Sequence, residues 1–396
     1  MNGATLQGKP VSTTSPTRAI STLLRLEDGI IPTEQGGQNL EHYLFEEFVE
    51  SSSSGLRRAY YVLKPFIPRF VQLAVRKRYT KIQEARTFPQ WPIEPTVVEM
   101  IEATLRHAIE NQPDKRVGRL SYWPDGKKAA LVITHDVEWD SGLRAASRLV
   151  EVEKRHGFCS SWNIVPERYP IDWSIVDGLR KDGFEIGVHG LKHDGKLFNS
   201  HELFQERLVR IHEYAKKWGA VGFRSPATLR NVHWMPELRF EYDSSYTDTD
   251  PYEPQAGGCC TIWPFFIGDL LEMPITMPQD HTLFEILGHD SVELWKNKAN
   301  WIESNGGMIL INVHPDYIDS ERRLKLYEEF LVEMKAKTNI WNALPKDVAR
   351  WWKDRSNSQL KRTNGCFTVE GPAAGRAAIL LTTLENGMLC DKGTPN

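Results

Sequence analysis

The sequence predicts an α/β fold in which the strands of a parallel sheet or barrel alternate with helices. Residues 127–136, KKAALVITHD, are a continuous apolar run that ends in polar residues, which is typical of a buried parallel strand. From this point strand-like and helix-like segments follow one another along the chain. Alternation of this kind indicates parallel strands joined by helices, with the functional residues at the strand ends.

The individual segments follow from their hydrophobic patterns and their Gly and Pro boundaries. The predicted strands are 127–136, 158–165, 184–190, 220–226, 268–276 and 307–315, and the predicted helices of this region are 141–156, 172–183, 200–219, 321–338 and 345–353. The last three strands close on polar residues, so we expect chemistry at that edge of the sheet.

The domain organisation follows from changes of composition along the chain. Residues 1–20 are rich in Gly, Ser, Thr and Pro and are expected to be disordered. A helical extension and connector over 21–120 should precede the main domain at 121–353. Residues 354–396 lose periodicity, and we treat them as a tail of unknown role.

The composition describes an ordinary soluble globular protein. The chain has 396 residues, 40% hydrophobic residues and a formal charge of −3, which argues against a nucleic-acid partner. No apolar run approaches the roughly 18 residues of a membrane span, and the N-terminus lacks the apolar segment of a secretory signal, so we expect a cytoplasmic location. The five cysteines fit neither a disulfide framework nor a CxxC zinc site.

Residues 57–86 mix basic side chains with aromatic and aliphatic ones. Such a segment suits peripheral contact with an anionic membrane surface or partner. The alternative is a helical segment that packs on the main domain and exposes its basic face to solvent.

A candidate metal site begins with His189 and His193 in EIGVHGLKHDG. Neutral imidazoles are good ligands for zinc and similar divalent ions, and a spacing of four places both on one face of a helix or tight turn. In a chain with twelve histidines the pair could arise by chance. The segment ITHDVEWD adds Asp136, Glu138 and Asp140 at the end of the first strand, and two histidines with one carboxylate leave an open position on a metal. The alternative is a solvated acidic loop.

Three further strand ends carry candidate residues. GFRSPAT supplies Arg224, with Pro226 stiffening the turn; LLEMP supplies Glu272; LINVHP supplies His314. An arginine keeps a neighbouring carboxylate ionised and oriented, and a histidine can protonate a leaving group. Taken singly, Arg224 could form a structural ion pair and His314 could be a core histidine.

The order of these motifs resembles the polysaccharide deacetylase family (NodB homology, carbohydrate esterase family four) over about residues 127–350. The phrases HGFCSSWNIV and DGFEIGVHGLKH match its second and third strands, and the region from GFRSP to LEMPITMPQDHT is similar to a bacterial subgroup. The resemblance implies a distorted (β/α)7 barrel with about seven strands. It also implies a divalent metal on an Asp-His-His triad and hydrolysis of an N-acetyl group from an amino sugar.

Carried over by position, the resemblance makes His189 and His193 metal ligands, Arg224 the residue that orients the catalytic base, and His314 the general acid. Glu272 or Asp280 would raise the pKa of His314 if either were close. The chain departs from the family at the first motif, where Val137 follows Asp136 in place of a second aspartate. We favour Asp136 as base and Glu138 as third ligand; the alternative is that Asp136 itself binds the metal.

The predicted substrate contacts are Trp139 and Trp263, together with Tyr246 and Pro226, although most aromatic residues of such a chain fill its core. The predicted function is metal-dependent N-deacetylation of a nucleotide-, lipid- or oligosaccharide-linked amino sugar, with zinc as the default metal. Two alternatives are C–N bond hydrolysis in a small non-sugar amide and an inactive barrel that binds carbohydrate. The sequence does not indicate an oligomeric state.

Overall fold

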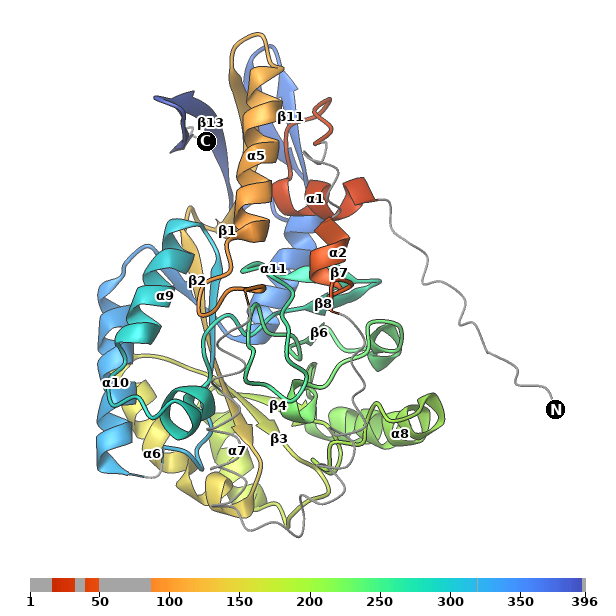
Figure 1. Cartoon of the computed structure of the whole chain (residues 1–396), viewed down its shortest axis with the longest axis vertical. Helices are drawn as coiled ribbons and strands as arrows, with labels where there is room; N and C mark the ends of the chain where they lie inside the picture. The colour runs from red at the N-terminus through yellow and green to blue at the C-terminus, as the bar shows by residue number, and fades with distance from the viewer. Residues whose placement is uncertain (1–15, 33–39, 50–86, 319, 394–396) are drawn as a thin grey trace, which may run out of the picture.

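A distorted barrel forms the centre of the molecule (Figure 1). The computed structural model describes residues 16–32, 40–49, 87–318 and 320–393. Within these residues seven strands run parallel around the barrel. In the order of the sheet they are β9 (Met308–Asn312), β2 (Ala129–Val137), β3 (Ser161–Ile164), β4 (Glu185–His189), β5 (Gly222–Arg224), β6 (Tyr242–Asp243) and β8 (Leu270–Glu272).

The barrel closes between the segment after β8 and strand β9. The amide of Met277 donates to the carbonyl of Leu310 at 3.1 Å, and the amide of Leu310 donates to Oγ1 of Thr276 at 2.9 Å. β10 (Ile340–Asn342) adds a parallel strand to the first half of β2, and β7 (Phe265–Ile267) pairs antiparallel with β8. The carboxyl ends of the parallel strands therefore face one rim.

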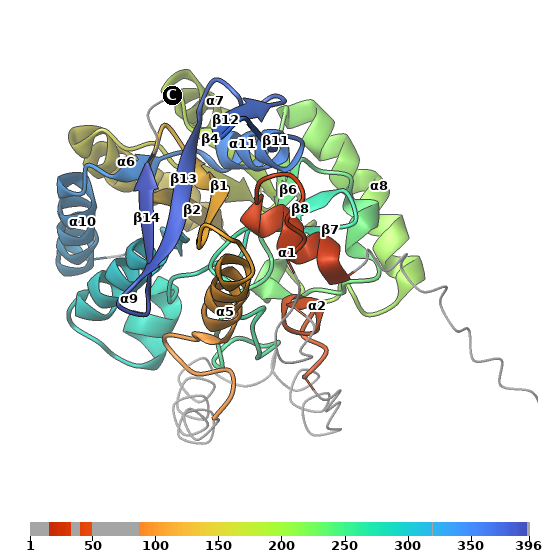
Figure 2. The ribbon, with the colours of Figure 1, turned by 90° about the horizontal axis from the view of Figure 1, so that it is seen from above.

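Helices surround the strands on the outside (Figures 1 and 2). They are α6 (Asp140–His156), α7 (Trp173–Lys181), α8 (His201–Trp218), α9 (Glu293–Ser304), α10 (Glu321–Ala336) and α11 (Pro345–Ser356), with short turns η3 (Pro226–Thr228), η4 (Met235–Leu238) and η5 (His281–Ile286). All six predicted strands and five predicted helices of this region are confirmed. The sequence pattern missed α9 and the short strands β6, β7 and β10, which have only two or three residues and are too short to show a period.

The C-terminal residues form strands, although the sequence predicted no regular structure for them. β1 (Arg116–Pro124) pairs with β13 (Ala377–Glu385), which pairs with β14 (Met388–Gly393). β11 (Gln359–Thr363) and β12 (Cys366–Glu370) form a second hairpin. Each hairpin turns at an Asn-Gly step with positive φ at both residues, a strong hairpin signal that the periodicity argument overlooked.

Helix α5 (Thr96–Glu110), which falls within the predicted helical extension and connector over 21–120, lies beside these strands at the top of Figure 1. Helices α1 (Pro16–Leu24) and α2 (Leu40–Leu44) pack nearby, and Ile20 is fully buried. The predicted disordered segment 1–20 therefore ends too late, because its last residues are helical. The basic segment 57–86 lies outside the described residues. No described helix is long and apolar enough to span a membrane.

Arg355 connects the elements above the barrel. Its side chain is fully buried on α11 and donates to the carbonyls of Ser121, Thr22 and Leu23 at 2.8, 3.0 and 2.8 Å. These acceptors belong to β1 and α1. The guanidinium thus satisfies backbone groups of two segments that are more than 90 residues apart in the sequence.

We expect Arg355→Met to lower the free energy of unfolding by about 3 kcal/mol, because it leaves several buried carbonyls without donors. Chemical denaturation measures this change. Arg350→Met, an exposed position on the same helix, is the matched control and should change stability by less than about 0.5 kcal/mol. Equal effects of the two substitutions would contradict the role given to Arg355.

Candidate active site

Asp136 lies at the end of β2 and is held by three side chains. Oδ1 accepts hydrogen bonds from Nη1 of Arg224 at 3.0 Å and from Nδ2 of Asn163 at 2.9 Å, and Oδ2 accepts from Nδ2 of Asn312 at 2.9 Å. These partners stand on β5, β3 and β9. Gly187 on the adjacent strand leaves the space for Asn163, since a Cβ there would lie 2.2 Å from its Oδ1.

The surroundings keep the Asp136 carboxyl ionised. Burial alone would raise its pKa, but Arg224, His189 and His314 together hold the pKa well below its ordinary value. Arg224 is itself held by Ser244, whose carbonyl and hydroxyl oxygens accept from Nε and Nη2 at 2.8 Å each. The site therefore contains a buried, oriented carboxylate.

Glu138, His189 and His193 form a second group beside Asp136. One ligand atom from each of the three lies within 4.8 Å of the others. Nε2 of His193 is 2.9 Å from Oε1 of Glu138, and the two imidazole rings are 5.1 Å apart. His189 and His193 lie on a tight turn and not on a helix. His189 ends β4, Gly190 has φ +60° and His193 has φ +51°. A left-handed histidine is uncommon, and such backbone strain is found at functional sites.

The donor set of this group fits a divalent metal ion. Nδ1 of His189 faces the carbonyl of Arg224 at 3.1 Å, which leaves Nε2 as the free nitrogen. Among the described residues that buried Nε2 has no hydrogen-bond partner. Burial lowers the pKa of His189 to about 4, so the ring is neutral near pH 7, as a ligand must be. Two imidazoles and one carboxylate are a ligand set used by zinc.

His314 faces both carboxylates from the end of β9. Its Nε2 lies 3.9 Å from Oδ2 of Asp136 and 3.9 Å from Oε1 of Glu138. Its Nδ1 and its backbone amide each lie 2.7 Å from the carboxylate of Asp280. Burial alone would lower the pKa of His314, but Asp280 and the other two carboxylates raise it to about 10. The imidazole is thus doubly protonated near neutral pH.

Of the two predicted partners of His314, the structure selects Asp280. Glu272, also predicted as a catalytic residue, is fully buried against β6, where its Oε1 accepts from the Tyr246 amide at 3.0 Å and Asp243 is its neighbour. The prediction for Glu272 is wrong in this respect, because its carboxyl group interacts with Tyr246 and Asp243, whereas Asp280 contacts His314.

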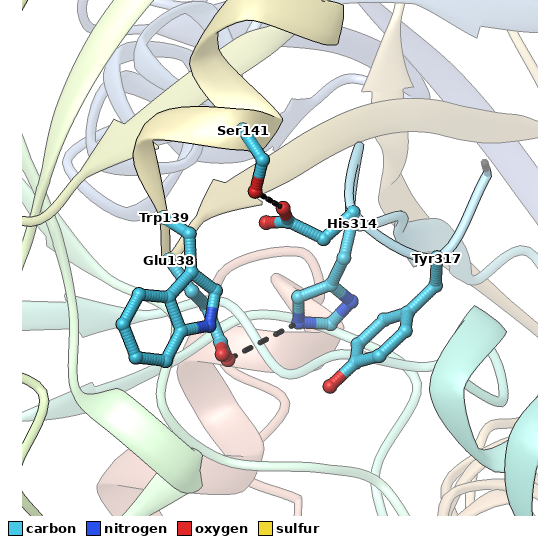
Figure 3. Close-up of a pocket in the computed structure, with 6 residues that line it drawn as sticks. Glu138, Trp139, Ser141, His314 and Tyr317 are labelled. Atoms are coloured by element: carbon cyan, nitrogen blue, oxygen red, sulfur yellow. Dashed lines mark hydrogen bonds and ion pairs between the residues drawn. The ribbon is translucent and has the colours of Figure 1, made fainter.

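A cavity of about 350 Å³ opens next to Glu138 and His314 (Figure 3). Its remaining lining residues are Trp139, Ser141, Asp316 and Tyr317. Trp139, a predicted substrate contact, is 48% exposed and lines this cavity.

The other three predicted substrate contacts are buried packing residues, so those predictions are wrong. Trp263 is 2% exposed, and its Nε1 donates to the carbonyl of Gly306. Tyr246 packs its ring against Phe265. Pro226 is buried against Gly190, where an added Cβ would lie 2.4 Å from its Cδ.

Sequence reasoning did not single out Asn163 and Asn312, and it left Asp280 as one of two options. Both asparagines lie within predicted strands, in SSWNIV and LINVHP. A polar residue inside an otherwise apolar buried strand is the signal that points to them, because buried amides require partners. Nothing in the sequence around Asp280 fixes its distance from His314.

Comparison with solved structures finds many that are similar to this chain, including the following three. A Mycobacterium smegmatis protein provisionally named a polysaccharide deacetylase is 22% identical (TM-score 0.48), and PuuE allantoinase is 17% identical (TM-score 0.49). A Pseudomonas aeruginosa protein, also provisionally named a polysaccharide deacetylase, is 19% identical (TM-score 0.46). These matches cover 58% of this chain and 92, 92 and 93% of the three structures.

Two of these proteins carry the name of the family that the sequence resembles. No family model and no curated protein matches the chain. Identities below 25% and TM-scores below 0.5 leave the function to be argued from the site itself.

The raised pKa of His314 predicts a pH dependence of stability. The folded protein keeps this proton up to about pH 10, whereas the unfolded chain releases it near the ordinary value of about 6.5. The resulting stabilisation is complete below pH 6.5 and is lost as the pH rises to 10. The difference in unfolding free energy between the metal-free wild type and His314→Gln should shrink over this range in denaturation experiments.

Asp280→Asn is the matched control, because it removes the carboxylate that raises the pKa of His314 and keeps the side-chain shape. In the Asp280→Asn background, the effect of His314→Gln on the unfolding free energy should change much less between pH 6.5 and pH 10. A difference between wild type and His314→Gln that stays constant from pH 6.5 to 10 would contradict the assignment.

Proposed function

We propose that the chain is a metal-dependent amide hydrolase that removes the N-acetyl group from an amino sugar. The observation that carries the proposal is one largely buried cluster of three functional parts. It contains Glu138, His189 and His193, whose donor atoms could hold a metal ion, together with an ionised Asp136 and a protonated His314. Amide hydrolysis needs these three functions: activation of water, removal of its proton, and protonation of the departing nitrogen.

Glu138, His189 and His193 would hold the ion, and zinc is the metal that we propose for them. A bound divalent ion polarises the amide carbonyl and lowers the pKa of water. Asp136 is the weaker candidate for the ligand set, since both of its oxygens already accept hydrogen bonds from Arg224, Asn163 and Asn312.

Asp136 is the proposed general base. Its carboxylate is ionised, and its Oδ2 lies on the side of His189 and His314, 3.9 Å from Nε2 of each. It would take the proton of the attacking water as the oxygen bonds to the acetyl carbon. The fixed bonds from Arg224 and Asn312 hold the carboxylate in one orientation, which limits the reorganisation needed during the reaction.

His314 is the proposed general acid. Because Nδ1 donates to Asp280, the second proton sits on Nε2, toward the cavity and the two carboxylates. Nε2 would give this proton to the amide nitrogen as the C–N bond breaks, so that the products are acetate and a free amine. Asp280 stabilises the charged imidazole and fixes its orientation, as an acid of this kind requires.

The test separates the two carboxylates by measuring metal content and acetate release from N-acetylglucosamine oligosaccharides. Glu138→Ala should lose the bound metal, measured by elemental analysis, together with the activity. Asp136→Asn should keep the metal, because the ligand set is intact, while kcat falls by about 10²-fold or more. His233→Ala, an exposed histidine, is the control and should keep both.

Three outcomes would contradict the proposal. Loss of metal in Asp136→Asn with retention in Glu138→Ala would reverse the two roles. Metal binding together with hydrolysis of small non-sugar amides, but of no acetylated sugar, would make the chain a C–N hydrolase of another substrate class. A wild type that binds sugar but no metal would be an inactive carbohydrate-binding barrel.

A further inference from the structure

The cavity beside the catalytic cluster has an aromatic wall and a polar wall that the proposed chemistry does not use. Trp139 and Tyr317 flank the cavity, and Glu138 and His314 lie between them (Figure 3). Ser141, on α6, also lines the cavity, and its hydroxyl group points at a carboxylate oxygen. That carboxylate belongs to Asp316.

Trp139 is the more exposed of the two aromatic residues that line the cavity. About half of its side chain is exposed, which is unusual for tryptophan, the largest apolar side chain. The guanidinium of Arg168 lies 3.4 Å from the centre of its ring, and a cation stacked in this way fixes the indole. A rigid, exposed aromatic ring beside a catalytic cluster offers an apolar face to a ligand at low entropic cost.

Ser141 and Asp316 form the polar wall. The Ser141 hydroxyl donates to Oδ1 of Asp316 at 2.5 Å, so the serine proton is already used. Oδ2 of Asp316 is shielded from solvent and has no hydrogen-bond partner among the described residues. Gly142 makes room for this carboxyl group, since a Cβ there would lie 2.5 Å from Oδ2. The pair therefore offers hydrogen-bond acceptors and lacks a donor.

An unpartnered carboxylate oxygen in a cavity wall indicates a missing donor, because unsatisfied buried acceptors cost free energy. Ring hydroxyls of a sugar are such donors, and the C–H face of the same ring is the apolar surface that stacks on an indole. A small amide without hydroxyl groups lacks these ring donors for Asp316.

We propose that Trp139, Ser141 and Asp316 form a sugar-binding subsite next to the scissile amide. In this subsite the sugar ring lies on Trp139 and donates a hydroxyl hydrogen bond to Asp316. The inference rests on the proposed deacetylase function and adds to it that the enzyme selects its substrate by the polyhydroxylated ring. Asp316 and Trp139 are therefore specificity-determining residues.

The first experiment measures binding of N-acetylated chitotriose by calorimetry, with Asp136→Asn as the background that slows turnover. Adding Asp316→Asn should weaken binding about tenfold, the value of one hydrogen bond to a charged group. Adding Trp139→Ala should weaken it at least as much. The matched controls are Asp290→Asn, an exposed aspartate, and Trp173→Ala, an exposed tryptophan near Lys217, and neither should change the dissociation constant.

The second experiment compares kcat/KM for the acetylated sugar with kcat/KM for 4-nitroacetanilide, an amide without hydroxyl groups. In the wild-type background, Asp316→Asn should lower the ratio of kcat/KM for the sugar to kcat/KM for 4-nitroacetanilide about tenfold. The fall should come mainly from a higher KM for the sugar. An equal fall for both substrates would indicate a merely structural role and would overturn the subsite.

The outcomes distinguish this inference from the function on which it rests. If neither substrate is hydrolysed but Asp316→Asn still weakens sugar binding, the subsite stands and the proposed deacetylase function fails. If the acetylated sugar is hydrolysed but binds the Asp316→Asn variant as tightly as the background protein, the subsite is wrong and the proposed deacetylase function stands.

Discussion

The buried ion pair between Arg224 and Asp136 is the interaction on which the rest of the site depends. Both side chains are almost fully buried, and such a pair is favourable only when further hydrogen bonds satisfy the remaining polar atoms. Asn163, Asn312 and Ser244 supply these bonds from β3, β9 and the segment after β6. Because the partners come from strands across the barrel, the pair fixes the relative positions of the strand ends that carry His189 and His314.

The same geometry explains how the chain uses an Asp-Val-Glu segment where its resemblance implies adjacent aspartates. Side chains two positions apart in extended backbone point to the same side. Asp136 and Glu138 therefore both reach the catalytic cluster, and Val137 between them packs into the core. The two carboxylates remain chemically distinct, because Asp136 is surrounded by fixed donors and Glu138 faces the histidines and the cavity.

The sequence predicted the barrel strands because each is a buried apolar run of ordinary length, and it predicted that the candidate site residues lie together because polar residues at strand ends share one rim. It identified Asp136, Glu138, His189, His193, Arg224 and His314 as candidates, and the structure brings all six together.

The choice between Asp280 and Glu272 depended on the path of the chain between β8 and β9, which no local pattern encodes. Trp263 and Tyr246 were misassigned because residue type does not separate an aromatic of the core from one of the surface. The pairing of β13 with β1 joins segments more than 250 residues apart, so its register has no local signature.

In the proposed function the two carboxylates divide their roles, with Glu138 as metal ligand and Asp136 as a base held by Arg224. The most direct measurement is anomalous X-ray scattering from crystals of the full chain grown with zinc. We expect one peak about 2 Å from Nε2 of His189, Nε2 of His193 and a Glu138 oxygen, while Asp136 keeps its bonds to Arg224 and Asn312. A peak within bonding distance of Asp136, with Glu138 turned away, would contradict this division of roles.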